Sequence, residues 1–406
     1  MIINFSVENF MSINERQDIS FKISKVEHLN DSSRKLDNGK ICNTITAVVG
    51  NNASGKTNIL KALAFLLWFS KKSYSFNEPF SSMVLPHALS GKKSSSFELH
   101  FEKDREEYIY KLILTNTKLE YEYFGKKQNR GFSYLYEVVR KNDALTVAKW
   151  SSKLGKLNEN DKNRFLGMHL CSFFSFLLST GYLVPLGINS LYPYTTNVGP
   201  GGKGSDNSFS FLLKASKLLK ENNARREKIN SFLRECDLGF SGLDFCKGVL
   251  TTRIKGQIEE EKGLEVLGMN HQVGKKTFRL PLLQESNGTQ KLVDFLNRII
   301  PVIENGGIVI WDELEDAIHP FLAKKIVQLF KSRNNNSQNS QLLFTTHAPL
   351  LLDECTKTQI YLVEKNNNLE SDLYRLDDVE GVRNGDNFST KYISGAYGAV
   401  PQGRWF

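Results

Sequence analysis

One run of eight residues has the residue types and spacing of a phosphate-binding loop. Its members are Gly50, Asn51, Asn52, Ala53, Ser54, Gly55, Lys56 and Thr57. Glycines at the first and sixth positions let backbone N–H groups converge on phosphate oxygens, and a helix expected from Asn58 onward adds its positive end. We expect Lys56 to contact the β- and γ-phosphates and the Thr57 hydroxyl to bind Mg²⁺, which prefers oxygen donors. The run therefore predicts a site for ATP and Mg²⁺ that includes all eight residues and Asn58.

Two acidic residues, Asp312 and Glu313, follow an apolar run in the second half of the chain. Residues 308–311 are large and apolar, as expected for a buried parallel strand that delivers carboxylates at its carboxyl end. Asp312 would hold Mg²⁺ through water, and Glu313 is placed to polarise the attacking water as a general base. An apolar strand that ends in two acids is common by itself, so this interpretation depends on the phosphate-binding loop.

Three further residue positions could lie near the phosphates. His347 follows another apolar run, where its imidazole could hydrogen-bond the γ-phosphate or the attacking water, although a lone histidine is usually structural or solvated. Ser286 and Gly288 precede an apolar helical pattern and could expose N–H groups at a helix N-terminus, which by itself is only a capped helix. His319 is expected to begin a helix rather than to be a ligand.

The periodicity of the chain predicts the elements that carry these residues. Residues 41–49 form a β-rich run before the loop, and residues 58–67 have the composition of a helix. Toward the other end, strands are expected at 307–311, 341–346 and 359–364, with a helix at 320–331. Other expected elements are an N-terminal hairpin (3–10 and 19–23), a β-meander (95–124), helices (162–178 and 208–236) and a flexible glycine-rich connection (197–205). Nucleotide chemistry is thus expected to be split between the two chain ends.

The composition is typical of a folded protein with room for two lobes. The chain has 406 residues, of which 40% are hydrophobic and 24% charged, so bulk disorder is excluded. Its five scattered cysteines suggest neither a disulfide framework nor a zinc site, and the N-terminus lacks a basic signal region. We expect a cytoplasmic protein without a membrane segment, in which the apolar stretch 165–186 is buried. The net charge of +9 makes contact with nucleic acid possible without demonstrating it.

Taken in order, the four segments resemble the head of ABC-type ATPases. Walker A lies at 50–57, the signature at 286–290, Walker B at 308–313 and the switch histidine at His347. The opening Val-Glu-Asn-Phe (7–10), the Glu-Ser-Asn-Gly-Thr form of the signature (285–289) and the closing segment 392–401 look like single-chain, SMC/OLD-like ATPases of bacterial anti-phage and abortive-infection operons, of the RloA/AbiLi type. The resemblance covers both ends of the chain and leaves the middle unassigned.

The resemblance implies a site that is completed by assembly. Two heads would sandwich ATP, with Ser286 and Gly288 of one subunit meeting the γ-phosphate bound by Lys56 of the other, so a homodimer or larger ring is expected. No glutamine stands at a convincing strand end between Thr57 and the helical middle, so the Q-loop of such heads is not placed. Relatives of the overcoming-lysogenization-defect type carry a Toprim nuclease, but the 59 residues after His347 (348–406) contain no convincing acidic cluster. Any nuclease or toxin is expected to be a separate chain.

The resulting prediction is an α/β ABC-type P-loop NTPase head, a mixed sheet with an antiparallel β-subdomain, plus a mainly helical insertion. We expect residues 1–155 to form the N-terminal half of the head, 156–240 the insertion and 241–406 the C-terminal half. The leading hypothesis is a Mg²⁺-dependent ATPase that acts as the sensor or regulatory subunit of an anti-phage system. The alternative is a DNA-binding repair ATPase whose basic residues contact phosphates, although a solvated helix face is the simpler interpretation; these residues are Lys214, Lys217, Lys220, Arg225, Arg226 and Lys228. A transporter subunit is disfavoured.

Overall fold

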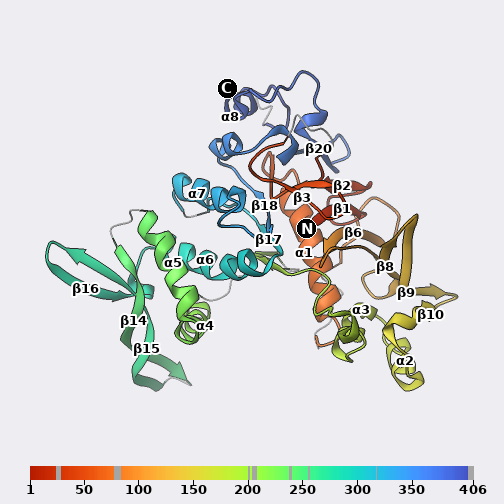
Figure 1. Cartoon of the computed structure of the whole chain (residues 1–406), viewed down its shortest axis with the longest axis horizontal. Coiled ribbons are helices and arrows are strands. Elements are labelled where there is room, and N and C mark those ends of the chain that lie inside the picture. Colours follow the sequence, from red (N-terminus) through yellow and green to blue (C-terminus); the bar gives the residue numbers. More distant parts are fainter. Residues whose placement is uncertain are drawn as a thin grey trace.

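A computed structural model describes residues 1–23, 29–76, 84–199, 202–203, 208–236, 240–254, 257–316 and 318–400. Pro401 of the predicted closing segment, much of the glycine-rich stretch and the side chain of Lys214 lie outside the described part. The chain forms an α/β body from which two smaller units extend to opposite sides (Figure 1). The N-terminal and C-terminal parts of the sequence both contribute to the body.

The central sheet interleaves strands from distant parts of the chain. Its order is β11 (Tyr194–Thr196), β17 (Ile308–Trp311), β18 (Gln341–Thr345), β5 (Ile45–Gly50), β19 (Ile360–Lys365) and β20 (Ser371–Arg375). The first five strands are parallel, and β20 pairs antiparallel with β19. Because carboxyl ends of parallel strands meet at one edge, the ends of β5, β17 and β18 lie side by side. The predicted strands around both nucleotide segments are confirmed, with β5 beginning only after a break at Thr44.

Successive residues of β5 face two hydrophobic cores, as in a parallel sheet that is covered on both sides. Val48 belongs to the first core together with Leu63 of α1 (Lys56–Lys72). Ala47 and Val49 belong to the second core, which includes apolar residues of α6 (Asn287–Asn305) and α7 (Pro320–Lys331). The sheet is therefore the middle layer of three, and the predicted α/β P-loop class is confirmed.

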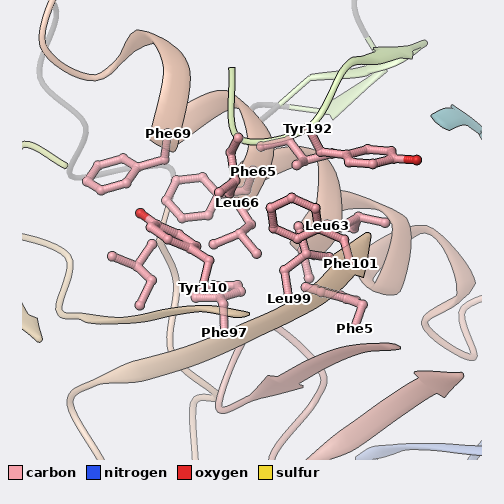
Figure 2. Packing of buried hydrophobic residues seen from close by; sticks show 14 of the residues in the cluster. Phe5, Leu63, Phe65, Leu66, Phe69, Phe97, Leu99, Phe101, Tyr110 and Tyr192 are labelled. Carbon is pink, nitrogen blue, oxygen red and sulfur yellow. The ribbon is translucent and has the colours of Figure 1, made fainter. Parts of the chain in front are cut away.

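A second sheet of seven antiparallel strands shares the first core with α1. Its order is β10 (Ala144–Trp150), β9 (Gly131–Lys141), β8 (Leu119–Gln128), β7 (Glu106–Leu114), β6 (Ser95–Lys103), β1 (Ile2–Glu8) and β2 (Gln17–Ser20). Figure 2 shows Phe97 of β6 close to Phe65 of α1, and their ring centroids lie 5.5 Å apart. The predicted N-terminal hairpin and β-meander are confirmed, and β9 and β10 extend the meander beyond the prediction.

Helices and one further sheet form the units that extend from the body. The predicted helix at 162–178 is two helices, α2 (Glu159–Leu166) and α3 (Phe173–Ser179), because Ser172 caps the second one. The predicted helix at 208–236 is likewise interrupted at Asn222, which caps α5 (Asn223–Glu235) after α4 (Ser208–Glu221). A three-stranded antiparallel sheet that the sequence did not predict follows, with β14 (Phe240–Ile254), β15 (Gln257–Val273) and β16 (Lys276–Pro281). The middle of the chain is therefore partly β.

The remaining elements are short. They are β3 (Ser33–Lys35) with β4 (Ile41–Asn43), β12 (Val198–Gly199) with β13 (Gly202–Lys203), and the C-terminal helix α8 (Phe388–Ile393). In the apolar stretch 165–186, Phe165, Phe173 and Phe176 are buried in the first core, as expected. None of the helices among the described residues has the length and apolar character needed to cross a membrane.

Candidate nucleotide site

The loop from β5 to α1 has a backbone that only glycine accommodates at two positions. Gly50 has φ +154°, and a Cβ there would lie 2.2 Å from the carbonyl oxygen of Val363. Gly55 has φ +110°, and its Cβ would lie 2.0 Å from Ser371 Oγ. Both positions therefore exclude side chains, which explains the glycine spacing of the loop. The helix begins directly at Lys56, so its first N–H groups face the loop.

The ammonium of Lys56 lies within the loop. Its Nζ donates to the carbonyl oxygens of Gly50 and Asn51, each at 2.8 Å, and only 6% of the residue is exposed. Burial lowers the pKa of Lys56, while the negative charges of Asp312 and Glu313 oppose this shift. The group lies where a phosphate could replace the two carbonyl contacts.

Two polar side chains of the loop are buried without a hydrogen-bond partner in the described part of the chain. They are Asn51, through Oδ1, and Ser54, through Oγ. Buried polar atoms are normally paired, so such groups point to a missing ligand. A Ser54 hydroxyl can donate to a phosphate oxygen, whereas Asn58 uses its amide to donate to Ser12 Oγ at 2.7 Å. The loop thus fits a phosphate group, and the Asn58 side chain is hydrogen-bonded to Ser12 of the protein.

The Thr57 hydroxyl, in the first turn of α1, lies close to the carboxylate of Asp312 at the end of β17. Thr57 Oγ1 lies 3.1 Å from both Asp312 oxygens, and Thr345 Oγ1 donates to Asp312 Oδ1 at 2.7 Å. Asp312 is 4% exposed. A hydroxyl and a carboxylate that converge in this way are the hard oxygen donors that Mg²⁺ prefers, so these residues fit the implied metal. Thr345 is a residue of this site that the sequence did not reveal.

Asn197 holds the main chain of Asp312. Its Nδ2 donates to the Asp312 carbonyl at 2.9 Å, and its Oδ1 accepts from the Asp312 amide at 2.8 Å. Asn197 directly follows β11, which pairs with β17, so the edge strand brings it beside the Asp312 carboxylate. Sequence reasoning placed this residue in a flexible connection; its only signal was the β-rich Tyr-Thr-Thr that precedes it.

Glu313 and His347 lie at the open side of the site. His347 Nε2 and Glu313 Oε1 are 3.9 Å apart, and their side chains are 42% and 39% exposed. Glu313 has a left-handed backbone with φ +52°, and its amide donates to Thr345 Oγ1 at 2.7 Å. Glu315, which the sequence did not single out, accepts hydrogen bonds from the Thr346 hydroxyl and the His347 amide. The strand ends thus hold the acid and the imidazole near one another.

Ser286 and Gly288 lie on a separate element. The Ser286 hydroxyl caps α6 by accepting from the Thr289 amide at 3.2 Å, and the hydrogen bonds of its side chain in the described structure stay within this first turn. Lys291 in the same helix pairs with Asp316 at 3.0 Å, which ties the start of α6 to the loop after Glu313. The structure therefore joins the segments predicted as Walker A and Walker B with His347 through direct contacts, but it does not join the predicted signature to them.

The other two predicted features have internal roles. His319 caps α7 by accepting from the Phe321 amide through Nδ1 at 3.2 Å, which confirms it as a helix-start residue. Two lysines of the basic insertion form ion pairs, Lys220 with Glu265 and Lys228 with Glu304. Arg226 lies over the ring of Phe245 at 5.0 Å. Such pairing reduces the charge available to nucleic acid.

The family described as “AAA domain, putative AbiEii toxin, Type IV TA system” matches residues 45–153 and 207–353. These residues are more than half of the chain and include the P-loop, Asp312, Glu313 and His347. The chain belongs to this family. The predicted resemblance to ABC-type ATPases of abortive-infection systems is thereby confirmed.

Relatives of this AbiEii-type AAA protein include the “Retron Vc95 probable ATPase” of Vibrio cholerae serotype O1 biovar El Tor. The two are 25% identical over 79% of this chain and 69% of the relative. Among solved structures, the SMC head domain from Thermotoga maritima is 16% identical, with a TM-score of 0.41 over 92% of this chain and 98% of that chain. An Smc head bound to the C-winged helix domain of ScpA is 13% identical, with a TM-score of 0.49 over 94% of this chain and 99% of that chain.

Proposed function

We propose that the chain binds ATP with Mg²⁺ and hydrolyses it to ADP and phosphate at the site formed by the P-loop, Asp312, Glu313 and His347. The observation that carries the proposal is the convergence of the Thr57 hydroxyl on the Asp312 carboxylate at 3.1 Å, although the two residues lie 255 positions apart in sequence. Membership of an AAA family and the name of the retron relative support it. Packing alone does not explain why the Thr57 hydroxyl is paired with the buried Asp312 carboxylate.

The roles of the side chains follow from their positions. Thr57 and Asp312 would hold Mg²⁺, which neutralises charge on the phosphate oxygens. Lys56 would exchange its two carbonyl partners for phosphate oxygens. Glu313 would accept the proton of the attacking water, and His347, 3.9 Å from it, would orient the terminal phosphate or that water. These assignments place binding at the buried end and proton transfer at the open end.

Binding of Mg-ATP can be tested with two lysine variants of the same helix. Lys56→Ala should weaken binding at least about tenfold, because a buried charge-assisted contact is lost. Lys72→Ala removes an exposed lysine from the last turn of α1 and should leave affinity unchanged. Isothermal titration calorimetry with ATP distinguishes them. Equal affinity of Lys56→Ala and the unchanged protein would contradict the proposal.

We further propose that two copies close on ATP, with Ser286 and Gly288 of one copy at the γ-phosphate bound by Lys56 of the other. The separate position of the α6 N-terminus supports this, because a helix start offers N–H donors to an anion. A Glu313→Gln variant, which should trap ATP, is expected to elute as a larger species in gel filtration with Mg-ATP than without it. Adding Ser286→Arg should abolish the shift, and an unchanged mass of Glu313→Gln would refute closure.

We propose that this ATPase is a cytoplasmic sensor or regulatory subunit of a bacterial anti-phage system that controls a separate nuclease or toxin. The family description and the retron relative support a defence role. Mass spectrometry of proteins that co-purify with the chain should reveal a companion effector. The DNA-repair alternative predicts instead salt-sensitive binding to duplex DNA, and the ion pairs of Lys220 and Lys228 weigh against it.

A further inference from the structure

Residues 392–400, which are the end of the C-terminal helix α8 and the segment after it, border a pocket at the start of the P-loop. A pocket of about 530 Å³ is bounded on one side by residues 49–52 and on another by Thr346, His347 and Pro349. Its third wall consists of residues 392–395 and Val400. A segment remote in sequence therefore shares a pocket with the first P-loop residues and the switch histidine.

Helix α8 and the segment of residues 392–400 are each anchored outside the pocket. Asp353, in the turn after His347, accepts hydrogen bonds from the amide and hydroxyl of Ser389 in α8, at 3.1 and 2.8 Å. Further on, the Tyr374 hydroxyl lies 2.9 Å from the carbonyl oxygen of Tyr397. Gly398 has φ +76°, and a Cβ there would lie 2.7 Å from the Tyr374 hydroxyl. The segment is therefore fixed by contacts with β20 and the switch region, independently of a ligand.

Tyr392 connects the segment to the P-loop. Its hydroxyl donates to the Ala399 carbonyl at 3.1 Å, which folds the segment back on itself. Tyr392 also lines the same pocket as Gly50. Burial raises the pKa of Tyr392, and the nearby Gly50 amide opposes this shift. The Tyr392 hydroxyl thus holds the C-terminal segment, while the residue lines the same pocket as the first residue of the P-loop.

We propose that Tyr392 is a positioning residue of the nucleotide site, through which segment 392–400 fixes residues 50–52 of the P-loop and favours a nucleotide with a third phosphate. The inference rests on the proposed function. Asn51 and Asn52 line the pocket together with His347, which lies 3.9 Å from the proposed base Glu313. The pocket therefore lies at the γ-phosphate end of the proposed site. The other end of the loop, with Gly55 and Thr57 at the helix start, would bind the phosphates that ADP also has.

The test compares the affinity of a non-hydrolysable ATP analogue with that of ADP, both with Mg²⁺, by calorimetry. Tyr392→Phe should weaken analogue binding about three- to tenfold, the effect of one hydrogen bond, and change ADP binding less than about twofold. Tyr182→Phe is the control, because its hydroxyl contacts Asp161 on α2. Unchanged analogue affinity, or an equal loss for both nucleotides, would overturn the inference.

A second test uses two glycine variants in which Tyr392 itself is unchanged, and only one of them should displace the segment. Gly398→Ala would force the segment away from Tyr374, whereas Gly381→Ala has a similar φ of +81° and no neighbour within 4 Å. Only Gly398→Ala should lower the ratio of analogue to ADP affinity. If both variants, or neither, lower this ratio, the inference is refuted. If the unchanged protein binds neither nucleotide, both the proposed function and the inference are refuted. If the unchanged protein binds both nucleotides and Tyr392→Phe has the same affinities, only the inference is refuted.

Discussion

Removal of the Asn197 side chain is expected to damage the nucleotide site through the main chain of Asp312. Asn197→Ala deletes the hydrogen bonds of 2.9 and 2.8 Å to the Asp312 carbonyl and amide. Each bond contributes about 1 kcal/mol net, and each unpaired buried group costs about 1–3 kcal/mol. Asn197 lines a pocket of about 380 Å³ beside Asp312, so water can reach the freed groups. The two freed groups together would cost about 2–6 kcal/mol. Because water can reach them, we expect the unfolding free energy to fall by only about 2–3 kcal/mol.

The same substitution should also lower ATP turnover. A carboxylate displaced by a fraction of an ångström would no longer hold the proposed Mg²⁺ in place, so ATP turnover should fall about 10- to 100-fold. The matched control is Asn336→Ala. Asn336 is buried and makes three hydrogen bonds, at 2.9, 2.8 and 2.7 Å, in the loop before β18 at the opposite edge of the sheet. It should lose similar stability in urea unfolding but keep its turnover. Full activity of Asn197→Ala, or an equal loss in the control, would refute this reasoning.

Two further predictions concern stability. Gly50→Ala should lower the unfolding free energy by about 2–3 kcal/mol, because its Cβ would overlap the Val363 carbonyl at 2.2 Å; urea unfolding that matches the unchanged protein would contradict this. Burial raises the pKa of Glu107, but hydrogen bonds from Lys40 and His100 outweigh it and leave the pKa lowered. The stability that Glu107 contributes is therefore present above the ordinary glutamate pKa of about 4.3 and is lost as pH falls below it. Glu107→Gln should flatten the decrease in unfolding free energy between about pH 5 and 3, and an unchanged acid slope would disprove the assignment.

The candidate site residues in the predicted Walker A and Walker B segments can be identified from the sequence because each pattern is local. The glycine spacing, the lysine and the hydroxyl of residues 50–57 are contiguous, and Asp312 and Glu313 directly follow their apolar strand. Parallel strand order then places both at one edge of the sheet, which needs no knowledge of side-chain packing. The elements confirmed around the site are those that a residue pattern within one contiguous segment identifies.

Asn197 and Tyr392 could not be predicted for the opposite reason. Asn197 acts on a residue 115 positions away, through a strand of only three residues whose pairing with β17 is a tertiary property. Tyr392 lines a pocket together with the P-loop because α8 packs on the turn after His347. The sheet β14–β16 was missed because its sequence, with Glu-Glu-Glu-Lys at 259–262, lacks the apolar alternation that identifies strands.

The central claim is that residues 50–57, Asp312 and Glu313 form one site that hydrolyses ATP. Single-turnover measurements with radiolabelled Mg-ATP test it most directly, comparing the unchanged protein with Glu313→Gln at protein in excess over ATP. We predict that both bind ATP and that Glu313→Gln cleaves it about 100- to 10,000-fold more slowly, the contribution expected of a general base. Absence of ATP cleavage by the unchanged protein, or cleavage by Glu313→Gln at the same rate, would contradict the claim.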